Sequence, residues 1–223
     1  MSIKKILLAT AALLLAHAAQ AQIAVTADVG TTGIGAHLIV PMEKTLNGRF
    51  GGHFFTYDKG DRFGSVNYDT KNKMRTFDVL FDWYVFDNSP LHATAGVMYN
   101  GSKISATARP NADGGYIING KPYTATDVAT LTGKIEYHKV APYLGIGWGN
   151  PLTSKSAWSL TGDLGVYFQG KPKSQLASVG CLTSNVVCNA LARDVAAHKP
   201  SFQADADSYK VYPVLRVGAA YRF

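Results

Sequence analysis

The chain has 223 residues, with 22 Lys and Arg against 15 Asp and Glu, which gives a formal net charge of +7 at pH 7. Beyond the N-terminal segment no stretch approaches the roughly 18 uninterrupted apolar residues of a membrane-spanning helix, so the sequence excludes a helical membrane protein. The positive charges are scattered over many predicted hairpins instead of one face, which argues against nucleic acid as a partner.

The N-terminal segment predicts export. Lys4–Lys5 form a short basic start, Ile6–Leu15 an apolar run, and Ala19–Ala21 a cleavage site of the A-x-A kind. The apolar run is too short to span a membrane as a helix, which needs ~20 residues. We therefore predict that residues 1–21 are a cleaved signal peptide and that residues 22–223 form a single domain.

Eight later segments carry apolar or aromatic residues at every second position, which is the period of a strand with one apolar face. The segments are residues 23–29, 32–41, 48–58, 66–86, 91–107, 130–149, 157–178 and 208–223. The alternation is weakest in the first segment. This segment is included because outer-membrane barrels of a single chain have an even number of strands.

The faces opposite the bulky residues favour a barrel over a soluble sandwich. They carry Gly, Ala, Thr, Asp and His, which suit the crowded lumen of a small barrel, whereas the water-facing side of a sandwich carries charges. The sequence predicts an all-β fold, a closed antiparallel up-and-down transmembrane β-barrel of eight strands. Ten strands are the alternative, if a long loop contains a further hairpin.

The predicted connections alternate in length. Short ones fall at residues 42–47, 87–90 and 150–157, and long ones near residues 59–65, 108–129 and 180–207. Membrane-spanning barrels combine tight turns on one side with longer loops on the other. Within the long segments, Asn119-Gly120 predicts a small hairpin, and residues 185–199 predict a short helix that ends at Pro200.

The two cysteines of the chain, Cys181 and Cys188, both fall in the last long segment. Because an exported chain enters an oxidising compartment, we expect a disulfide that closes a small loop. A two-cysteine metal site is the alternative, but no nearby pair of histidines has zinc-ligand spacing. The sequence has no nucleotide loop, CxxC pair or acidic calcium loop, so we expect no cofactor and no metal.

Charged and polar side chains occupy inward positions of the predicted strands. We expect a lumen network of Arg49, His53, Asp78, Asp82, His92, Asp163 and Arg216, with His37, Gln169 and Arg222 as further lumen residues. Buried charges require partners of opposite sign. Since an eight-stranded barrel is only just wide enough for its side chains to fill it, we predict a plugged interior. A narrow polar path or a small-solute site is the alternative.

The chain ends on its most regular strand. Apolar or aromatic side chains occupy every second position from Tyr209 to Phe223, and the last three residues are Tyr221, Arg222 and Phe223. This ending resembles the terminal strand of bacterial outer-membrane β-barrels, and the whole chain is similar to small barrels of the OmpA transmembrane-domain, OmpX and OmpW kind. The resemblance implies a monomer in the bacterial outer membrane, with Tyr221 and Phe223 as the signal for the barrel assembly machinery. Periplasmic chaperones, the lipid bilayer and lipopolysaccharide are the other implied partners.

The half of the barrel away from the C-terminus is expected to carry a basic rim. Its members are Lys59, Arg62, Lys71, Lys73, Arg75, Lys103, Arg109, Lys121, Lys134, Lys139, Lys171 and Lys173. Such a rim would lie beside the phosphates of lipopolysaccharide, since anionic headgroups attract Lys and Arg. Solvated loop charge without a defined partner is the alternative.

These features together predict an integral outer-membrane protein with a structural or surface-interaction role through its outer loops. The alternative is a narrow channel or carrier for small or hydrophobic solutes. A lipid A-modifying enzyme is a third class to consider, because Ser102, Ser105, Glu136 and His138 have the composition of a hydrolytic site. No spacing ties a nucleophile to a base, so we predict no catalytic residue.

Overall fold

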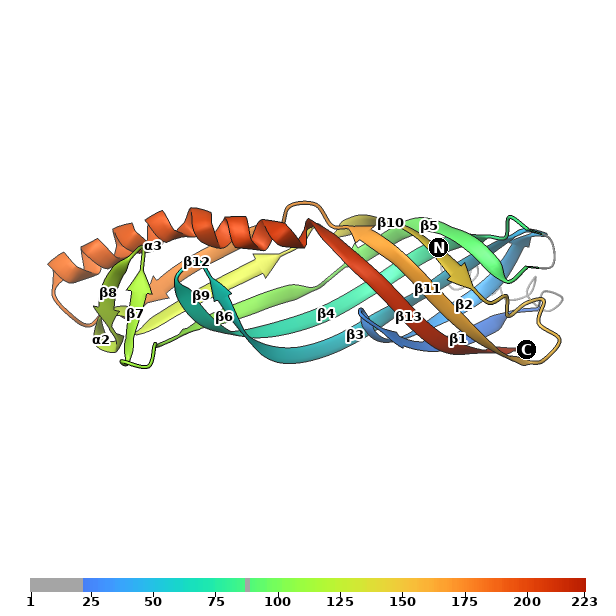
Figure 1. Ribbon diagram of the computed structural model, residues 1–223, viewed down its shortest axis with the longest axis horizontal. Helices are drawn as coiled ribbons and strands as arrows, with labels where there is room; N and C mark the ends of the chain where they lie inside the picture. Colours follow the sequence, from blue (N-terminus) through green and yellow to red (C-terminus); the bar gives the residue numbers. More distant parts are fainter. Residues whose placement is uncertain (1–21, 87–88) are drawn as a thin grey trace, which may run out of the picture.

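A computed structural model describes residues 22–86 and 89–223 of the chain. The predicted signal peptide, residues 1–21, lies outside the described residues, as does part of the predicted turn at residues 87–90. Antiparallel strands dominate the structure (Figure 1). They are β1 (Ala24–Gly30), β2 (Gly33–Glu43), β3 (Leu46–Phe63), β4 (Val66–Trp83), β5 (Leu91–Asn100), β6 (Lys103–Arg109), β7 (Gly115–Ile118), β8 (Lys121–Thr124), β9 (Thr130–Glu136), β10 (Val140–Trp148), β11 (Trp158–Phe168), β12 (Lys173–Val179) and β13 (Val211–Arg222). The helical elements are α2 (Ala125–Val128), α3 (Asn185–Ala206) and the 3-10 turn η1 (Asp207–Lys210).

Eight of these strands form a ring. Its order is β1, β2, β3, β4, β5, β10, β11 and β13, and β13 pairs back with β1, where Tyr221 lies opposite Val25. The sequence alternation produces this wall: along β1, Ala24, Thr26 and Asp28 are buried while the residues between them are exposed. The prediction of an antiparallel barrel of eight strands is confirmed, and the short first strand belongs to it.

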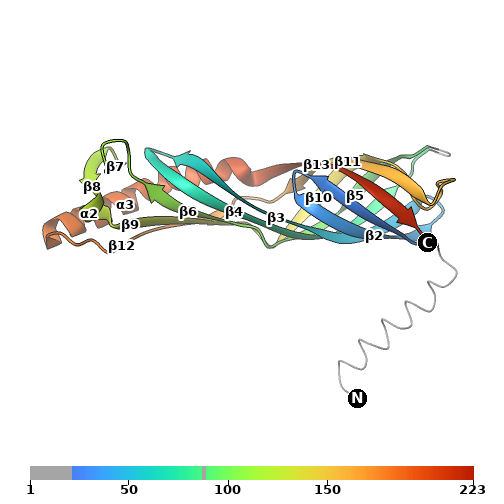
Figure 2. The ribbon, with the colours of Figure 1, turned by 90° about the horizontal axis from the view of Figure 1, so that it is seen from below.

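At one end of the ring two strands continue and six end. β1, β2 and β13 end there, whereas the distal halves of β3 and β4 continue beside β6, β9 and β12. We call this half-open sheet, with the segments that cover it, the extension (residues 55–73, 103–136 and 173–210). Figures 1 and 2 show α3 running along the extension, while the C-terminus lies at the opposite end of the ring, which we call the terminal end.

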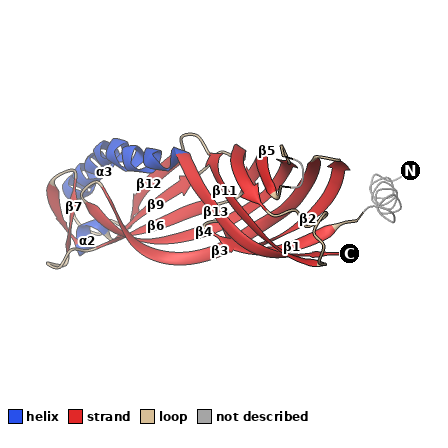
Figure 3. Cartoon of the chain, turned by 45° about the vertical axis from the view of Figure 1, so that its right-hand side comes forward, coloured by secondary structure: helices blue, strands red, loops and turns tan. Residues whose placement is uncertain are grey.

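Helix α3 covers the inner face of the extension, where the ring wall is missing (Figure 3). Inward positions of the strands are apolar here, and burying them against α3 stabilises the extension. The resulting core consists of Phe63, Val66, Tyr68, Ala106, Ala108, Tyr116, Ile118, Tyr123, Val128, Leu131, Ile135, Leu191, Val195, Phe202 and Ala206. Phe202 is fully buried at its centre, with ring centroids 4.8 Å from Phe63 and 5.7 Å from Tyr68.

The junction between ring and extension divides three of the predicted strands. Residues 91–107 form β5 and β6, residues 130–149 form β9 and β10, and residues 157–178 form β11 and β12. The wall changes there from a curved ring to a half-open sheet, and β5, β10 and β11 give way to β6, β9 and β12. The predicted strand 208–223 likewise starts later, at Val211, because η1 occupies residues 207–210.

The prediction of a long loop at residues 59–65 is wrong. β3 and β4 continue to Phe63 and Val66, which pair across a two-residue turn with Gly64 at φ +59°. The hairpin predicted at Asn119-Gly120 is present as β7 and β8, with both turn residues at positive φ.

The prediction that the helix ends at Pro200 is also wrong. α3 begins at Asn185 as expected but continues through Pro200 to Ala206. The continuation brings Phe202 and Ala206 into the extension core, and this burial offsets the backbone hydrogen bond that proline cannot donate.

An apolar belt covers the outside of the ring. Every ring strand contributes a large apolar side chain that is exposed, for example Val29, Leu38, Phe54, Phe77, Val97, Leu144, Leu164 and Leu215. Exposed aromatic residues gather at the terminal end, among them Trp83, Trp148, Trp158 and Tyr221. A continuous exposed belt of this kind, with aromatic residues at its edge, fits a hydrocarbon environment. No described helix is long and apolar enough to cross a membrane.

Candidate functional site

Charged and aromatic side chains form a buried layer across the lumen of the ring. The structure places all seven predicted network residues there: Arg49, His53, Asp78, Asp82, His92, Asp163 and Arg216. They lie on β3, β4, β5, β11 and β13, and Asp28 of β1, His37 of β2 and Tyr143 of β10 join them. Every strand of the ring therefore contributes to this layer, which we call the lumen network.

One half of the lumen network centres on Arg49. Its guanidinium donates to both oxygens of Asp163, at 2.7 and 2.6 Å, and to Asp82 at 3.1 Å. The hydroxyl of Thr94 donates to the same Asp82 oxygen at 2.7 Å. Two parallel bonds between guanidinium and carboxylate give the strongest geometry for such a pair. This contact connects β3 to β11 across the lumen.

The other half centres on Asp78. It accepts hydrogen bonds from Arg216 and Tyr167, each at 2.8 Å, and lies 3.0 Å from Nε2 of His37. Nδ1 of His37 lies 2.9 Å from Asp28. An ionised carboxylate only accepts, so both bonds of His37 form when its imidazole carries the second proton. His37 then acts as a cation between two carboxylates.

His53 closes the group on the β1 side. Its Nε2 lies 2.6 Å from Asp28, and Asp28, His37 and His53 bring three potential metal-ligating atoms within 4.8 Å of one another. The same atoms take part in the hydrogen bonds of the lumen network. These ligand types can hold a cation, and among the described residues they bond to one another as an ionic cluster in which Nδ1 of His53 has no partner.

Glycines in the wall make room for the imidazole rings. A Cβ at Gly51 would lie 2.4 Å from the ring of His37, and a Cβ at Gly147 would lie 2.1 Å from Nε2 of His92. Atoms cannot approach so closely, so a side chain at either position would displace the ring. This explains why glycine recurs on the lumen face of the strands.

A cavity lies on each side of the lumen network. The cavity toward the extension has a volume of about 120 Å³, and its lining includes Tyr57, Met74, Tyr137 and Tyr212. The cavity at the terminal end has a volume of about 660 Å³, and Tyr84 belongs to its lining. The two cavities share no lining residue, and the Arg49 and Asp78 clusters lie between them.

The predicted network residues lie together inside the ring, and sequence reasoning missed several of their partners. Asp28 was missed because it lies in the weakest predicted strand, and Tyr167 and Thr94 because neither carries a formal charge. The signal was available for two of them, since Thr94 shares the alternating face of His92 and Tyr167 shares that of Asp163. The hydrogen-bonded pairs of the lumen network were not predictable, because they join residues that are distant in sequence.

Two further predicted lumen residues lie outside the lumen network. Gln169 is buried and accepts a hydrogen bond from Asn100 at 2.6 Å, next to the cavity on the extension side. Arg222 is half-buried at the terminal end, where it donates to the carbonyl of Leu152 at 3.0 Å. The predicted assembly signal lies nearby: Tyr221 pairs with Trp158, and Phe223 is exposed. Recognition of this signal stays a prediction.

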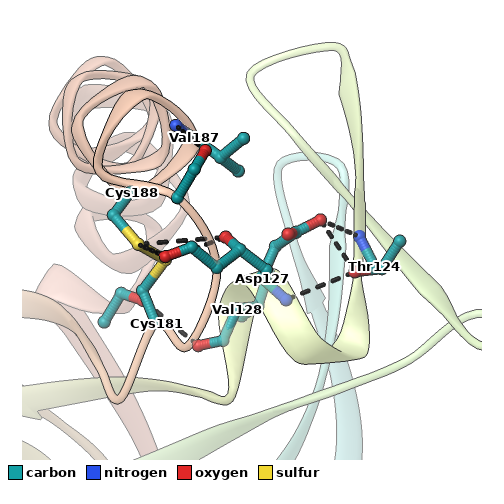
Figure 4. The surroundings of a disulfide bond; sticks show 9 residues. Thr124, Asp127, Val128, Cys181, Val187 and Cys188 are labelled. Atoms are coloured by element: carbon teal, nitrogen blue, oxygen red, sulfur yellow. Dashed lines mark hydrogen bonds between the residues drawn. A yellow bond between two sulfur atoms is a disulfide. The ribbon is translucent and has the colours of Figure 1, made fainter.

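The extension carries the expected disulfide. Cys181 and Cys188 are bonded, with their Cα atoms 5.8 Å apart, at the start of α3. Figure 4 shows Val128 and the capping pair Thr124 and Asp127 of α2 beside this bond. The disulfide therefore joins the segment before α3 to the first turn of α3, next to the short helix α2.

A buried carboxylate attaches the β7–β8 hairpin to α3. Asp194 accepts hydrogen bonds from Tyr123 at 2.5 Å, from Asn119 at 3.2 Å and from Lys121 at 3.0 Å. These three donors lower the pKa of Asp194 from 3.8 to about 2. Burial, followed by the contact with Asp194, raises the pKa of Tyr123 to about 12.

Two of the candidate hydrolytic residues, Ser102 and Glu136, line the same hollow, but no hydrogen bond among the described residues joins them. Ser102 accepts a hydrogen bond from the backbone N–H of Arg75 at 3.1 Å, and Glu136 pairs with Lys134 at 3.0 Å. Ser105 lies opposite Lys134 in the β6–β9 pairing. Within residues 22–86 and 89–223, His138 forms no hydrogen bond with a serine or a carboxylate.

Comparison with known proteins identifies the fold. No protein-family model matches the chain, and no curated protein matches it in sequence. Among solved structures, the crystal structure of Acinetobacter baumannii CarO2 matches with a TM-score of 0.60 at 22% identity, covering 92% of this chain and 100% of that one. Acinetobacter baumannii CarO matches with a TM-score of 0.53 at 22% identity, covering 90% of this chain and 97% of that one. These neighbours do not confirm the OmpA, OmpX and OmpW subgroup. The chain has the fold of bacterial outer-membrane β-barrel proteins.

Proposed function

We propose that this protein is an integral outer-membrane barrel with a plugged lumen, and that its role is carried by the extension at the outer surface. The observation that carries the proposal is the bonding of Arg49 to Asp163 and Asp82 across the middle of the ring. Buried ion pairs of this geometry hold their positions, since separating them leaves uncompensated charges. A solute or ion would have to break them to pass.

The extension supports a surface role. It has its own buried core, a disulfide, a long helix and an attached hairpin, all beyond the apolar belt. A barrel that served only as a membrane anchor would need no more than short loops at this end. The short turn between β2 and β3 at the terminal end supports insertion with that end toward the periplasm, which directs the extension outward.

Conductance in planar lipid bilayers tests the plug. The native protein is expected to give no discrete current steps, because the lumen network fills the ring. A triple variant, Arg49→Ala with Asp82→Ala and Asp163→Ala, removes the ion pairs without leaving an unpaired charge among them, and small steps are expected. Heat-modifiable gel migration checks that this variant is folded. Regular steps from the native protein would overturn the proposal.

Binding of a small solute is the second candidate function, favoured by the cavity on the extension side. The hydroxyls of Thr32 and Thr76 are buried at this cavity and have no hydrogen-bond partner among the described residues. An unpaired buried hydroxyl is unfavourable, and a solute with a polar group would satisfy it. Calorimetric titration with benzoate, an aromatic anion of suitable size, tests this candidate, with Thr76→Val as the variant expected to weaken binding. If the native protein does not bind benzoate, small-solute binding is excluded for aromatic anions of this size.

A further inference from the structure

The outside of the wall changes from apolar to basic at the junction of ring and extension. Phe77, Tyr99 and Val140 lie opposite one another on β4, β5 and β10, and each is at least half exposed. Beyond this row, toward the extension, the outward residues are Arg75 and Lys73 on β4 and Lys103 on β6, with Lys139 beside them. The apolar belt therefore ends directly at a basic edge.

Four cations of this edge line a hollow of about 220 Å³, which we call the basic notch: Lys73, Arg75, Lys103 and Lys139. The hollow forms because two strand breaks lie side by side. The N–H of Gly101 donates to the carbonyl of Arg75 at 2.8 Å, and the N–H of Asn100 donates to the carbonyl of Lys139 at 2.7 Å. In the β4–β6 pairing Lys73 lies opposite Lys103, which places two ammonium groups on the same face.

The positive charge of the basic notch is largely uncompensated. Glu136 is the carboxylate that lines the hollow, and it pairs with Lys134, which lies outside it. Lys134 first, and also Lys139 and Lys103, hold the pKa of Glu136 below its usual value, so this carboxylate is ionised. Four cations and one carboxylate leave a net charge of +3 (4 − 1) in the hollow. Among the described residues, none of the four notch cations forms an ion pair.

We propose that the basic notch binds a phosphate of lipid A, the phosphorylated glycolipid of the outer leaflet, with the acyl chains against Phe77, Tyr99 and Val140. Clustered cations repel one another, and an anion between them relieves this repulsion. The fork of the Arg75 guanidinium matches two phosphate oxygens, and the lysines supply further positive charge. A soluble phosphate would use the cations alone, whereas a lipid phosphate also uses the apolar row directly beside them. The inference rests on the proposed placement in the outer membrane and assigns a partner to this part of the wall.

Binding of diphosphoryl lipid A to the purified full-length protein, counted by native mass spectrometry, tests the proposal. The variant replaces all four notch cations, as Lys73→Gln, Arg75→Gln, Lys103→Gln and Lys139→Gln. Its affinity is expected to fall at least about tenfold, since each basic residue near an anionic surface contributes measurably. The matched control removes four exposed cations elsewhere, as Lys44→Gln, Lys155→Gln, Arg193→Gln and Lys199→Gln, and is expected to bind like the native protein. Native affinity in a folded notch variant would overturn the proposal.

Two further probes distinguish a lipid site from a phosphate site. Fully dephosphorylated lipid A is expected to bind the native protein and the notch variant equally weakly. Inorganic phosphate in excess is expected not to displace diphosphoryl lipid A, and complete displacement would show a site for free phosphate instead. If the four-fold variant does not fold, Lys103→Gln with Lys139→Gln provides a smaller change with the same expected direction. These measurements use purified protein, so they report on the notch even if the proposed orientation of the extension is wrong.

Discussion

Arg49 links β3 to β4 and β11 in the interior of the ring. Replacing Arg49 with Ala leaves Asp82 and Asp163 buried, with His92 as the nearest basic side chain at 3.7 Å from Asp82. Removing one partner of a buried ion pair costs about 3–5 kcal/mol, so we expect Arg49→Ala to lower the free energy of unfolding by this amount. Urea titration in phosphatidylcholine vesicles, followed by tryptophan fluorescence, measures it.

An exposed arginine provides the control for this change. Arg193 lies on the solvent side of α3, and Arg193→Ala is expected to alter the same free energy by no more than about 0.5 kcal/mol. If Arg49→Ala unfolds at the native urea concentration, the ion pairs do not hold the ring together and the account of the lumen network is wrong.

Asp194 predicts a pH dependence that is confined to the extension. Its pKa is about 2 in the folded protein and 3.8 ordinarily, so the carboxylate stabilises the folded hairpin above pH 3.8. This stabilisation is lost as the pH falls from about 4 to about 2. Hydrogen exchange at β7 and β8, corrected for the intrinsic pH effect, should therefore accelerate over this window in the native protein. Asp194→Asn should show no such step, and a step of equal size in the variant would contradict the assignment.

The lumen residues show what a sequence can and cannot establish about single residues. The alternation of inward and outward positions along each strand was sufficient to predict that Arg49, Asp78 and Asp163 point inward. A shift of one residue would expose their charges to lipid. The alternation of inward and outward positions does not give the height of a residue along the barrel axis. The pairing of Arg49 with Asp163 was therefore not predictable from the sequence. It depends on the stagger of the strands around the whole ring.

The disulfide belongs to the extension and not to the ring. Its closed loop is short, and cross-linking a loop of this size stabilises by about 2–3 kcal/mol in the chain-entropy treatment. Replacing Cys181 and Cys188 with Ser should loosen the start of α3, so proteases should cut near residues 180–190 more rapidly. Heat-modifiable gel migration should stay unchanged, since the ring does not use the bond. Loss of that migration would show that the ring depends on the disulfide.

The extension was the element-scale feature that the sequence did not reveal. Alternation continues through the break between β5 and β6, so Ile104, Ala106 and Ala108 look like lumen residues of a longer strand. Pro200 similarly looked like the end of a helix, although burial of Phe202 keeps the helix going. Tertiary packing determines both where the strand breaks and how far the helix continues. A local sequence pattern does not contain this information.

At the scale of the whole molecule, the surroundings of the apolar belt can be tested by one substitution. Leu215 is exposed near the middle of β13, and in hydrocarbon an Arg there costs about 2–4 kcal/mol. We expect Leu215→Arg to lower the free energy of unfolding in lipid vesicles by that amount. Leu182, which is exposed on the extension, is the matched control, and Leu182→Arg should change it little. Equal effects at the two positions would mean that lipid does not surround the belt.

Labelling of intact cells tests most directly whether the ring spans the outer membrane with the extension outside. In a Cys181→Ser and Cys188→Ser background, a single cysteine is placed at Asp113 in the extension or at Lys155 at the terminal end, both exposed. A membrane-impermeant maleimide should label Asp113→Cys on intact cells and Lys155→Cys only after the outer membrane is permeabilised. Labelling of Lys155→Cys but not Asp113→Cys on intact cells, or recovery of the protein in a detergent-free soluble extract, would contradict the account.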